Sequence, residues 1–430
     1  MNNALGLMKQ RQFLPLFVTQ FLGAFNDNLF KQAMVLVVVY QIYNDPAAEQ
    51  SFNGLASVFS IVPFVLLSAL AGQLADAHDK AKIIRIVKTA EIGIMLVGGA
   101  GLLLARHGAH YQIAMALMLS AVAALGVHST FFGPIKYAIL PQHLKEDEVL
   151  GGTGLVESAT YIAILAGTVV AGFLTIDYAV IGTLVIAAAG WVAARRVPPA
   201  PRQGPELKIN YNPFTSSWRL ISGTLHVPRL FLAICAISFF WTMGIVLIVI
   251  FTPLTKNVLT ADPHVATVLT ALFSIGIAIG SVAINSLLRG HTSAKYGPAT
   301  VLIMGGFVIV FALLCRTWPA ATPGHLYDSW EFLAIPHAWA VIASLIGIAV
   351  FGGMFVVPLY AFLTTTVTKD ETARTVAANN AVNSAAMAVG SAVVFLLAHA
   401  GVGSTTMLYL VAAMCPVAAW IAQKLHRACD

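Results

Sequence analysis

Residues 53–80 read NGLASVFSIVPFVLLSALAGQLADAHDK, and this stretch decides what kind of fold the chain can adopt. From residue 53 to residue 75 it holds no charged side chain, and Asp76 is the first one that follows. An α-helix needs about 20 apolar residues to cross the ~30 Å hydrocarbon core of a bilayer. The stretch therefore predicts a transmembrane helix that ends in a short polar loop.

The same kind of apolar stretch recurs along the whole chain. Of its 430 residues, 58% are hydrophobic and 10% are charged, whereas an ordinary soluble domain has about 25% charged residues. The mean hydropathy is +0.83. Hydropathy predicts twelve spans, near residues 13–40, 53–75, 83–105, 110–132, 150–174, 178–194, 230–254, 264–288, 299–316, 337–363, 375–399 and 403–423. The chain is therefore predicted to be an all-α polytopic membrane protein.

The basic residues indicate how these spans are oriented. The formal net charge of +6 would also suit a nucleic-acid binder, but Lys and Arg fall mostly in alternate loops of the predicted topology. If the N-terminus is cytoplasmic, the outside loops keep only Arg106, Lys256 and Arg316. Basic loops stay in the cytoplasm during insertion. Both termini are therefore expected on the cytoplasmic side, and no nucleic-acid partner is expected.

A long loop divides the spans into two groups of six. Residues 195–229 form the one long inside loop, which is expected to be irregular because it contains prolines at 198, 199, 201, 205 and 213. We therefore predict an N-terminal six-helix half at 1–195, a cytoplasmic linker at 196–228 and a C-terminal six-helix half at 229–430.

The two halves also share short sequence similarities. GPIKYAIL, from Gly133, resembles VPLYAFL, from Val357, and GLVESA, from Gly154, resembles NAVNSA, from Asn380. Parallel six-span repeats are the build of the major facilitator fold, which binds substrate near the bilayer midplane. Chance similarity between helices rich in Ala and Gly is the alternative. The predicted fold is the major facilitator fold, with twelve transmembrane helices in two six-helix halves.

The loop after the second span carries a further resemblance. GQLADAHDK, residues 72–80, resembles the major facilitator loop signature G-x-L-A-D-R-x-G-R-K, although Ala77 replaces the usual Arg and Asp79 the usual Gly. The resemblance implies that Asp76 acts in gating, by holding the end of a neighbouring helix when the carrier faces outward. The alternative is that Asp76 merely caps a helix.

Three longer segments resemble the bacterial lysophospholipid transporter family. They are QFLGAFNDNLFK from Gln20, FFGPIKYAILPQHL from Phe131 and GGTGLVESATYIAILAGT from Gly151. The resemblance implies a secondary transporter or flippase that moves lysophospholipids, such as lysophosphatidylethanolamine, from the outer to the inner leaflet of a bacterial cytoplasmic membrane. Its partners would be the lysophospholipid and the membrane lipids. Because the chain ends without a soluble domain, reacylation is expected from a separate acyltransferase or acyl-carrier ligase.

The first predicted span carries the strongest candidate for a substrate site. An ionisable residue inside a span is costly and usually faces a cavity or a partner, and Asp27 lies in the middle of this span. Gln20, Asp27 and Lys31 share one helical face, so they are predicted to bind substrate together with the neighbouring Asn26 and Asn28. The alternative is that Asp27 and Lys31, four residues apart, only neutralise each other.

Polar residues in four further spans, or next to them, are candidates for the substrate site or the transport path. Glu157 and Tyr161 are expected in the substrate site through the resemblance, whereas Lys136 and Tyr137 lie where a cation could attract a phosphodiester. The alternative for Lys136 is an anchor at the inner membrane surface.

Lys88 and Glu91 are three residues apart and are predicted to pair and to line the transport path. Alternatively, Lys88 reaches toward the inner headgroups with Glu91 as its partner. In the second half, Asn380 and Asn383 are neutral candidates for substrate binding, and interhelical hydrogen bonding is the competing explanation for them.

The sequence shows no signature of an enzyme. The chain has no P-loop, HExxH motif, nucleophile elbow or HxxxxD motif, so neither hydrolysis nor ATP-driven transport is expected. The four cysteines lie far apart, and no cofactor or metal site is expected. His128 is a lone span histidine, of a kind that is usually hydrogen-bonded within the helix bundle. The rival functions are a multidrug or amphiphile exporter of the same superfamily and a membrane scaffold for an acyltransferase.

Overall fold

The computed structural model describes residues 6–108, 110–202, 209–212, 214–216, 218, 222, 227–288, 293–319, 324–365 and 369–429. Within these ranges, it leaves undescribed the side chains of residues 146, 147, 149–151, 153, 154, 157, 158, 161, 285, 361–365, 369–374, 376, 377 and 429. The described part of the chain is almost entirely helical.

Twelve helices of 20 residues or more correspond one to one with the predicted spans. They are α2 (Leu14–Val37), α3 (Pro46–Ala77), α4 (Lys80–Arg106), α5 (Tyr111–Ala138), α7 (Glu146–Phe173), α8 (Ile176–Arg195), α10 (Pro228–Asn257), α11 (Pro263–Leu287), α12 (Gly297–Arg316), α14 (Pro336–Thr365), α15 (Lys369–His399) and α16 (Ser404–Cys429). Ten of these helices are long and apolar enough in their described residues to cross a membrane. The remaining two, α2 and α7, do not meet this criterion in their described residues. The prediction of a polytopic helical membrane protein is confirmed.

Shorter elements connect these helices. A π-helical turn, η2 (Val38–Ile42), directly follows α2, and turns of this kind often occur near functional sites. The other short elements are η1 (Leu7–Lys9), α6 (Leu140–His143) and α13 (Ser329–Ala334). α13 begins with a capping box, in which Asp328 accepts hydrogen bonds from backbone N–H groups and Glu331 accepts one from the N–H of Asp328.

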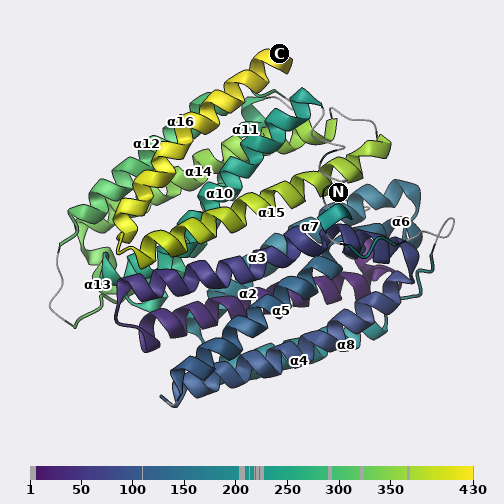
Figure 1. Cartoon of the computed structure of the whole chain (residues 1–430), viewed down its shortest axis with the longest axis horizontal. Coiled ribbons are helices and arrows are strands. Elements are labelled where there is room, and N and C mark those ends of the chain that lie inside the picture. Colours follow the sequence, from purple (N-terminus) through teal and green to yellow (C-terminus); the bar gives the residue numbers. More distant parts are fainter. Residues whose placement is uncertain are drawn as a thin grey trace. The chain divides into compact units, whose positions relative to one another are not determined.

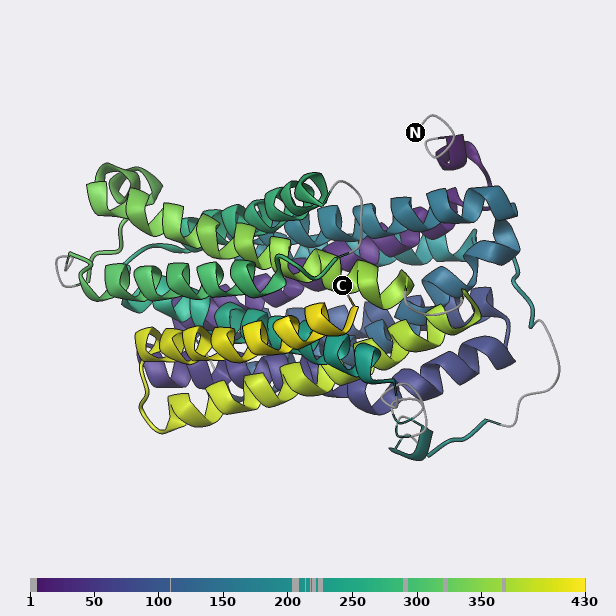
Figure 2. The ribbon, with the colours of Figure 1, turned by 90° about the horizontal axis from the view of Figure 1, so that it is seen from above.

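The chain forms two compact units, and the first helix of each packs in the same way. Unit 1 comprises Met1–Ile42 and Val62–Ser217, and unit 2 comprises Tyr43–Ile61 and Trp218–Asp430. In unit 1, α2 packs against α7 and α8, and α4 packs against α5 and α8. In unit 2, α10 packs against α15 and α16, and α12 packs against α14 and α16 (Figure 1; Figure 2). This recurring pattern supports the repeat suggested by the sequence.

The first part of α3 belongs to unit 2, although the sequence placed the whole helix in the N-terminal half. Gln50 donates a hydrogen bond to Ser404 at 2.7 Å, and Asn53 donates one to the carbonyl oxygen of Val249 at 3.4 Å. These contacts explain why residues 43–61 group with unit 2. The boundaries predicted at 196 and 228 remain a prediction.

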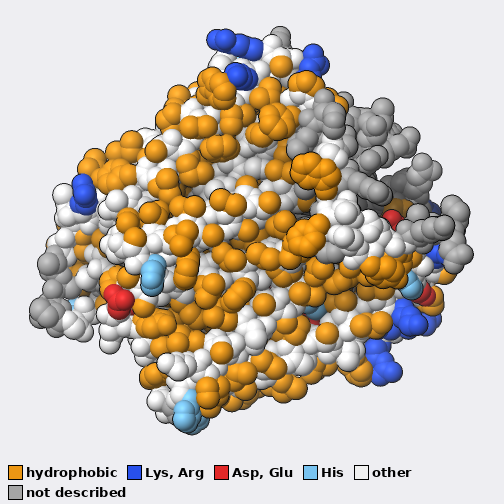
Figure 3. All heavy atoms as spheres, in the orientation of Figure 1, with side chains coloured by type: hydrophobic (Ala, Val, Ile, Leu, Met, Phe, Trp, Pro, Cys, Tyr) orange, Lys and Arg blue, Asp and Glu red, His pale blue; other side chains and the backbone are white. Residues whose placement is uncertain are grey.

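Hydrophobic side chains cover much of the surface, as a lipid-facing protein requires. On the face shown in Figure 3, orange side chains dominate, and blue Lys and Arg side chains lie near the margins. Ile86 is 60% exposed, Val185 61% and Val282 68%. In a soluble protein such contiguous apolar exposure would mark an interaction site, whereas on a spanning helix it is the surface in contact with lipid.

The loop between α3 and α4 contains a helix cap, but Asp76 does not provide it. Asp79, not Asp76, caps α4: its carboxylate accepts hydrogen bonds from the backbone N–H groups of Ala81 at 2.9 Å and Ala200 at 3.1 Å. The reason is position, because Asp79 immediately precedes α4 whereas Asp76 still lies within α3. The cap alternative for Asp76 is therefore wrong, and Asp76 is exposed.

Candidate functional site

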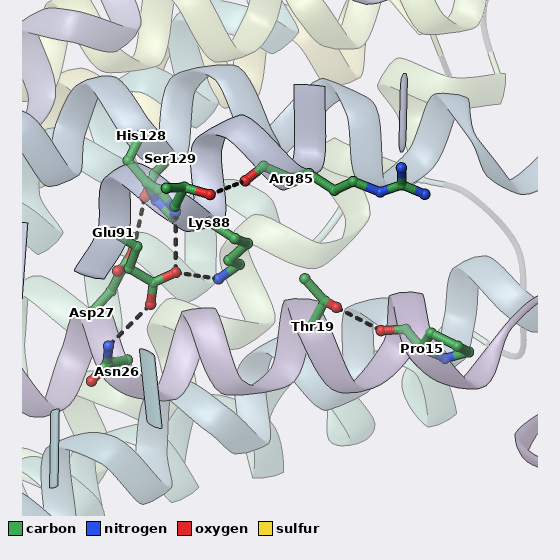
Figure 4. A network of polar contacts seen from close by, with 10 residues as sticks. Pro15, Thr19, Asn26, Asp27, Arg85, Lys88, Glu91, His128 and Ser129 are labelled. Carbon is green, nitrogen blue, oxygen red and sulfur yellow. Dashed lines mark hydrogen bonds and ion pairs between the residues drawn. The ribbon is translucent and has the colours of Figure 1, made fainter. Parts of the chain in front are cut away.

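Unit 1 contains a buried cluster of charged and polar side chains from three helices. Its centre is Glu91 on α4, which accepts hydrogen bonds from Lys88 at 2.5 Å and from Asn26 on α2 at 3.0 Å. The imidazole Nε2 of His128 on α5 lies 3.3 Å from the same carboxylate. Figure 4 shows these side chains converging on Glu91. We call these four residues the Glu91 cluster.

The Glu91 cluster is closed off from solvent and lipid. Lys88 and Asn26 are 0% exposed, Glu91 is 1% exposed and His128 is 5% exposed. Burying such charges is costly unless they are paired and hydrogen-bonded, and the carboxylate of Glu91 satisfies that condition for Lys88. The pairing predicted for Lys88 and Glu91 is confirmed, and the alternative in which Lys88 reaches the inner headgroups is wrong. The predicted place of the pair along the transport path stays a prediction.

Lys88 remains inside because its ammonium group has protein partners there. Its Nζ lies 5.2 Å from the ring centroid of Phe132, within the range of a cation–π contact. It also lies against Gly23 of α2, where a Cβ atom would collide with the ammonium group. The glycine therefore permits the close approach of Lys88 to α2.

Asp27 lies beside the Glu91 cluster but is paired differently. Its Oδ2 accepts a hydrogen bond from the Ser129 hydroxyl on α5 at 2.8 Å, and its Oδ1 is buried without a hydrogen-bond partner in the described part of the chain (Figure 4). The residue is 8% exposed. Among the described ion pairs there is none between Asp27 and Lys31. The alternative of a self-neutralising Asp27–Lys31 pair is therefore wrong.

The two carboxylates of this region are not equally satisfied. Glu91 pairs with Lys88, whereas Asp27 has no cationic partner among the described ion pairs and keeps one oxygen open. A buried carboxylate with an open acceptor oxygen can bind an ammonium group, a metal cation or a proton. Chemically, the arrangement is suited to receiving a positive group near the middle of α2.

A second group of polar side chains lies nearer the beginning of α2. The hydroxyl of Thr160 on α7 donates to Gln20 Oε1 at 2.9 Å, and Lys136 on α5 donates to that hydroxyl at 3.2 Å. The Lys136 ammonium also lies 4.8 Å from the ring centroid of Tyr137. The structure thus brings together three predicted residues, Gln20, Lys136 and Tyr137.

Two of the remaining first-half candidates are only half-buried, and the side chains of two others lie outside the described residues. Asn28 is half-buried and donates to the carbonyl oxygen of Ala24 in its own helix at 2.8 Å. Lys31 is half-buried. The side chains of Glu157 and Tyr161 lie outside the described residues, and their predicted places in the substrate site stay predictions.

The asparagines of α15 in unit 2 have different environments. Asn383 is 5% exposed, accepts a hydrogen bond from the Ser238 hydroxyl at 2.7 Å and lies 3.5 Å from the Tyr360 hydroxyl. Asn380 is exposed and accepts a 3.4 Å contact from Asn379. Asn383 thus takes part in interhelical hydrogen bonding, the competing explanation given for both residues, and substrate binding by either remains a prediction.

Sequence reasoning missed two sets of buried contacts. His128 and Ser129 were not recognised as partners of Glu91 and Asp27, because a single histidine or serine in a span carries no signal of its own. In unit 2, Glu49 is 0% exposed and accepts hydrogen bonds from Lys256 at 2.6 Å and from Asn257. The early position of Glu49 in an otherwise apolar helix is the signal that could have identified it.

Comparisons with known proteins concern the family and the fold of the chain. The family model of the Major Facilitator Superfamily matches residues 16–391. The Lysophospholipid transporter LplT of Cronobacter sakazakii (strain ATCC BAA-894) is 29% identical over 385 residues, which cover 88% of this chain and 85% of the relative. The Lysophospholipid transporter LplT of Salmonella heidelberg (strain SL476) is 29% identical over 410 residues, which cover 89% and 86%.

Solved structures share the fold. A bacterial homologue of the iron transporter ferroportin, in an inward-facing state, superposes with a TM-score of 0.68 at 12% identity, covering 97% of this chain and 98% of that chain. A D-xylose–proton symporter gives a TM-score of 0.68 at 12% identity, covering 96% and 97%. At such low identity these likenesses concern the fold alone.

Proposed function

Because this chain belongs to the major facilitator superfamily, we propose that it is a secondary transporter of lysophospholipids. It moves lysolipids of the lysophosphatidylethanolamine type from the outer to the inner leaflet of a bacterial cytoplasmic membrane by alternating access. A separate acyltransferase or acyl-carrier ligase then restores the second acyl chain. The support for this substrate comes from the two LplT relatives and from the three first-half segments that resemble their family.

The observation that carries the proposal is the buried carboxylate of Asp27 with an open oxygen. Its Oδ1 lies in a membrane helix without a hydrogen-bond partner in the described residues, and leaving such a group unsatisfied costs about 1–3 kcal/mol or more. An ethanolamine ammonium group would satisfy it with a charge-assisted hydrogen bond. The apolar walls of the helices suit the single acyl chain. A scaffold protein would have no need of this buried charge.

Uptake of labelled lysophosphatidylethanolamine into proteoliposomes tests the function. We expect the purified chain to move the lipid to the inner leaflet, where it becomes inaccessible to an external extracting protein such as albumin. The same vesicles loaded with a cationic amphiphile test the rival exporter. Transport of the amphiphile without transport of the lysolipid would refute the proposal, as would flipping no faster than in protein-free vesicles.

The proposed topology makes a separate prediction. Reporter tags at both termini and within residues 196–228 are expected to report the cytoplasmic side, because the basic loops lie there. A tag after Arg106, in a predicted outside loop, is the matched control and should report the opposite side. Accessibility to a membrane-impermeant reagent in intact cells measures this. A periplasmic signal from either terminus would overturn the twelve-span orientation.

A further inference from the structure

A short turn in the segment between α8 and α10 is held together by hydrogen bonds. The side-chain oxygen of Asn212 accepts hydrogen bonds from the backbone N–H groups of Phe214 at 3.0 Å and Thr215 at 3.2 Å. The side chain of Asn210 donates to the Thr215 hydroxyl at 2.9 Å, and the Ser216 hydroxyl donates to the carbonyl oxygen of Asn210 at 3.1 Å. Asparagine side chains commonly stabilise turns in this way. We call residues 210–212 and 214–216 the linker turn.

Gln73 attaches the linker turn to α3. Its Oε1 accepts a hydrogen bond from the backbone N–H of Asn210 at 2.7 Å, and its Nε2 donates one to the Ser216 hydroxyl at 3.1 Å. Ser216 is 7% exposed, so this side of the turn is closed. Gln73 and the linker turn both belong to unit 1. The turn is therefore held at one level along α3.

That level is where α3 leaves the hydrocarbon core. Residues 53–75 carry no charged side chain, and Asp76 is the first one that follows. Asp76 comes three residues after Gln73, which is roughly 4.5 Å along the axis of a helix. The headgroup region on each side of a bilayer is about 5–7 Å thick. A turn fixed to Gln73 therefore lies in the headgroup region or next to it.

The linker turn leaves large aromatic side chains exposed at this level. Tyr211 is 70% exposed and Phe214 is 69% exposed. Trp218, two residues after Ser216 in the sequence, is 72% exposed. Single exposed apolar residues are ordinary, but these are three aromatic residues within eight positions. Tyr and Trp are enriched at membrane–water interfaces, because their rings combine an apolar body with a polar group.

The charges of the surrounding sequence favour an anionic surface. Residues 201–229 contain the basic residues Arg202, Lys208, Arg219 and Arg229 and a single acidic residue, Glu206. Anionic headgroups attract basic segments that lie next to a membrane. An acidic protein surface would attract the same charges, but the attachment to Gln73 already places the turn at the level of the headgroups. Position and charge together favour lipid as the partner.

We propose that the linker turn docks on the membrane surface, with the rings of Tyr211, Phe214 and Trp218 among the headgroups of anionic phospholipids. In the proposed topology this surface is the inner leaflet. The docking does not depend on the transported substrate, because it follows from the level of the turn on α3 and from its exposed side chains. The connection between the two six-helix halves is then tied to unit 1 and to the membrane surface at the same place.

A fluorescent label on the linker turn tests this docking in the full chain. The four native cysteines are replaced by alanine, and Phe214→Cys carries the label in nanodiscs of phosphatidylethanolamine and phosphatidylglycerol. A nitroxide attached to the lipid is expected to quench this label several times more strongly than a label at Arg202→Cys, and aqueous iodide is expected to do the reverse. Arg202, exposed and outside the turn, is the matched control. Tyr211→Cys provides a second labelling position if Phe214→Cys does not fold.

Two further comparisons test the aromatic and the basic residues separately. Tyr211→Ser combined with Trp218→Ser should weaken the contact between lipid and the label at position 214, because it removes two native aromatic rings. Nanodiscs of phosphatidylcholine, whose headgroup has no net charge, should weaken that contact as well. Equal contact in the two kinds of nanodisc would overturn the role of the basic residues.

Two results would overturn the docking itself. If iodide quenches the labels at positions 214 and 211 as strongly as the label at position 202, the aromatic side chains lie in water and a protein is their partner instead. If the two serine substitutions leave the lipid contact unchanged, the label and not the native side chains inserts. None of these measurements uses transport, so a failure of the docking leaves the proposed function standing, and a failure of transport leaves the docking intact.

Discussion

Transport of lysophosphatidylethanolamine by the Asp27→Asn variant is expected to fall at least about tenfold, while the protein still folds. Asparagine has the same shape and keeps an acceptor for the Ser129 hydroxyl, which lies 2.8 Å from Oδ2 in the wild type. It loses the negative charge, and a hydrogen bond to a charged group contributes about 1.5–3 kcal/mol. Initial rates at matched reconstituted protein levels, with elution from a sizing column as the folding check, measure the effect.

Two further variants sharpen the interpretation of Asp27. The combination of Asp27→Asn with Lys31→Gln is expected to remain inactive, because the structure has no ion pair between these residues whose loss it could compensate. Asp177→Asn is the matched control, since it makes the same chemical change in a surface pair with Arg106 on the same unit. Exposed ion pairs of this kind contribute about 0–1 kcal/mol to the free energy of unfolding. Uptake restored by the double change would refute a binding role for Asp27.

The elements that the sequence predicted well are those set by local pattern. Ten of the twelve long helices contain, in their described residues, an apolar run long enough to span a bilayer, and such a run becomes a helix because a backbone in lipid must satisfy its own hydrogen bonds. The pairing of Lys88 with Glu91 is local in the same sense, since residues three apart face each other across one helical turn.

The contacts that the sequence could not predict are set by tertiary packing. Asn26 and Glu91 are 65 residues apart, and Lys256 and Glu49 are 207 apart. Which helices adjoin, and at what rotation, decides these pairings. The same limit explains the Asp27–Lys31 alternative: the spacing permits that pair, but the rotation of α2 turns Asp27 toward Ser129 of α5 instead. The need for glycine at position 23 likewise becomes apparent only in the folded structure, where the Lys88 ammonium group lies against Gly23.

Replacing Glu91 alone with glutamine is expected to destabilise the protein by about 3–5 kcal/mol, because it leaves the Lys88 ammonium buried without a counter-charge. Lys88 is 0% exposed in the present structure, so water does not screen the loss. Loss of soluble, monodisperse protein on heating in detergent measures the effect. Arg106→Gln, which breaks an exposed pair, is the matched control and should shift the midpoint little.

Removing both charges then tells a structural pair from one that lines the transport path. In Lys88→Met with Glu91→Gln neither member of the pair is left buried with an unpaired charge, and the glutamine oxygen can still accept the hydrogen bond that Asn26 donates at 3.0 Å. Replacing a buried ion pair by uncharged groups is often neutral or even stabilising, so we expect stability to return. We expect transport to return with it, because Lys88 contacts Glu91 and Phe132 within the protein rather than an open surface. A stable but inactive double variant would contradict this expectation. It would mean that the substrate requires the two charges themselves, and it would place the pair in the transport path.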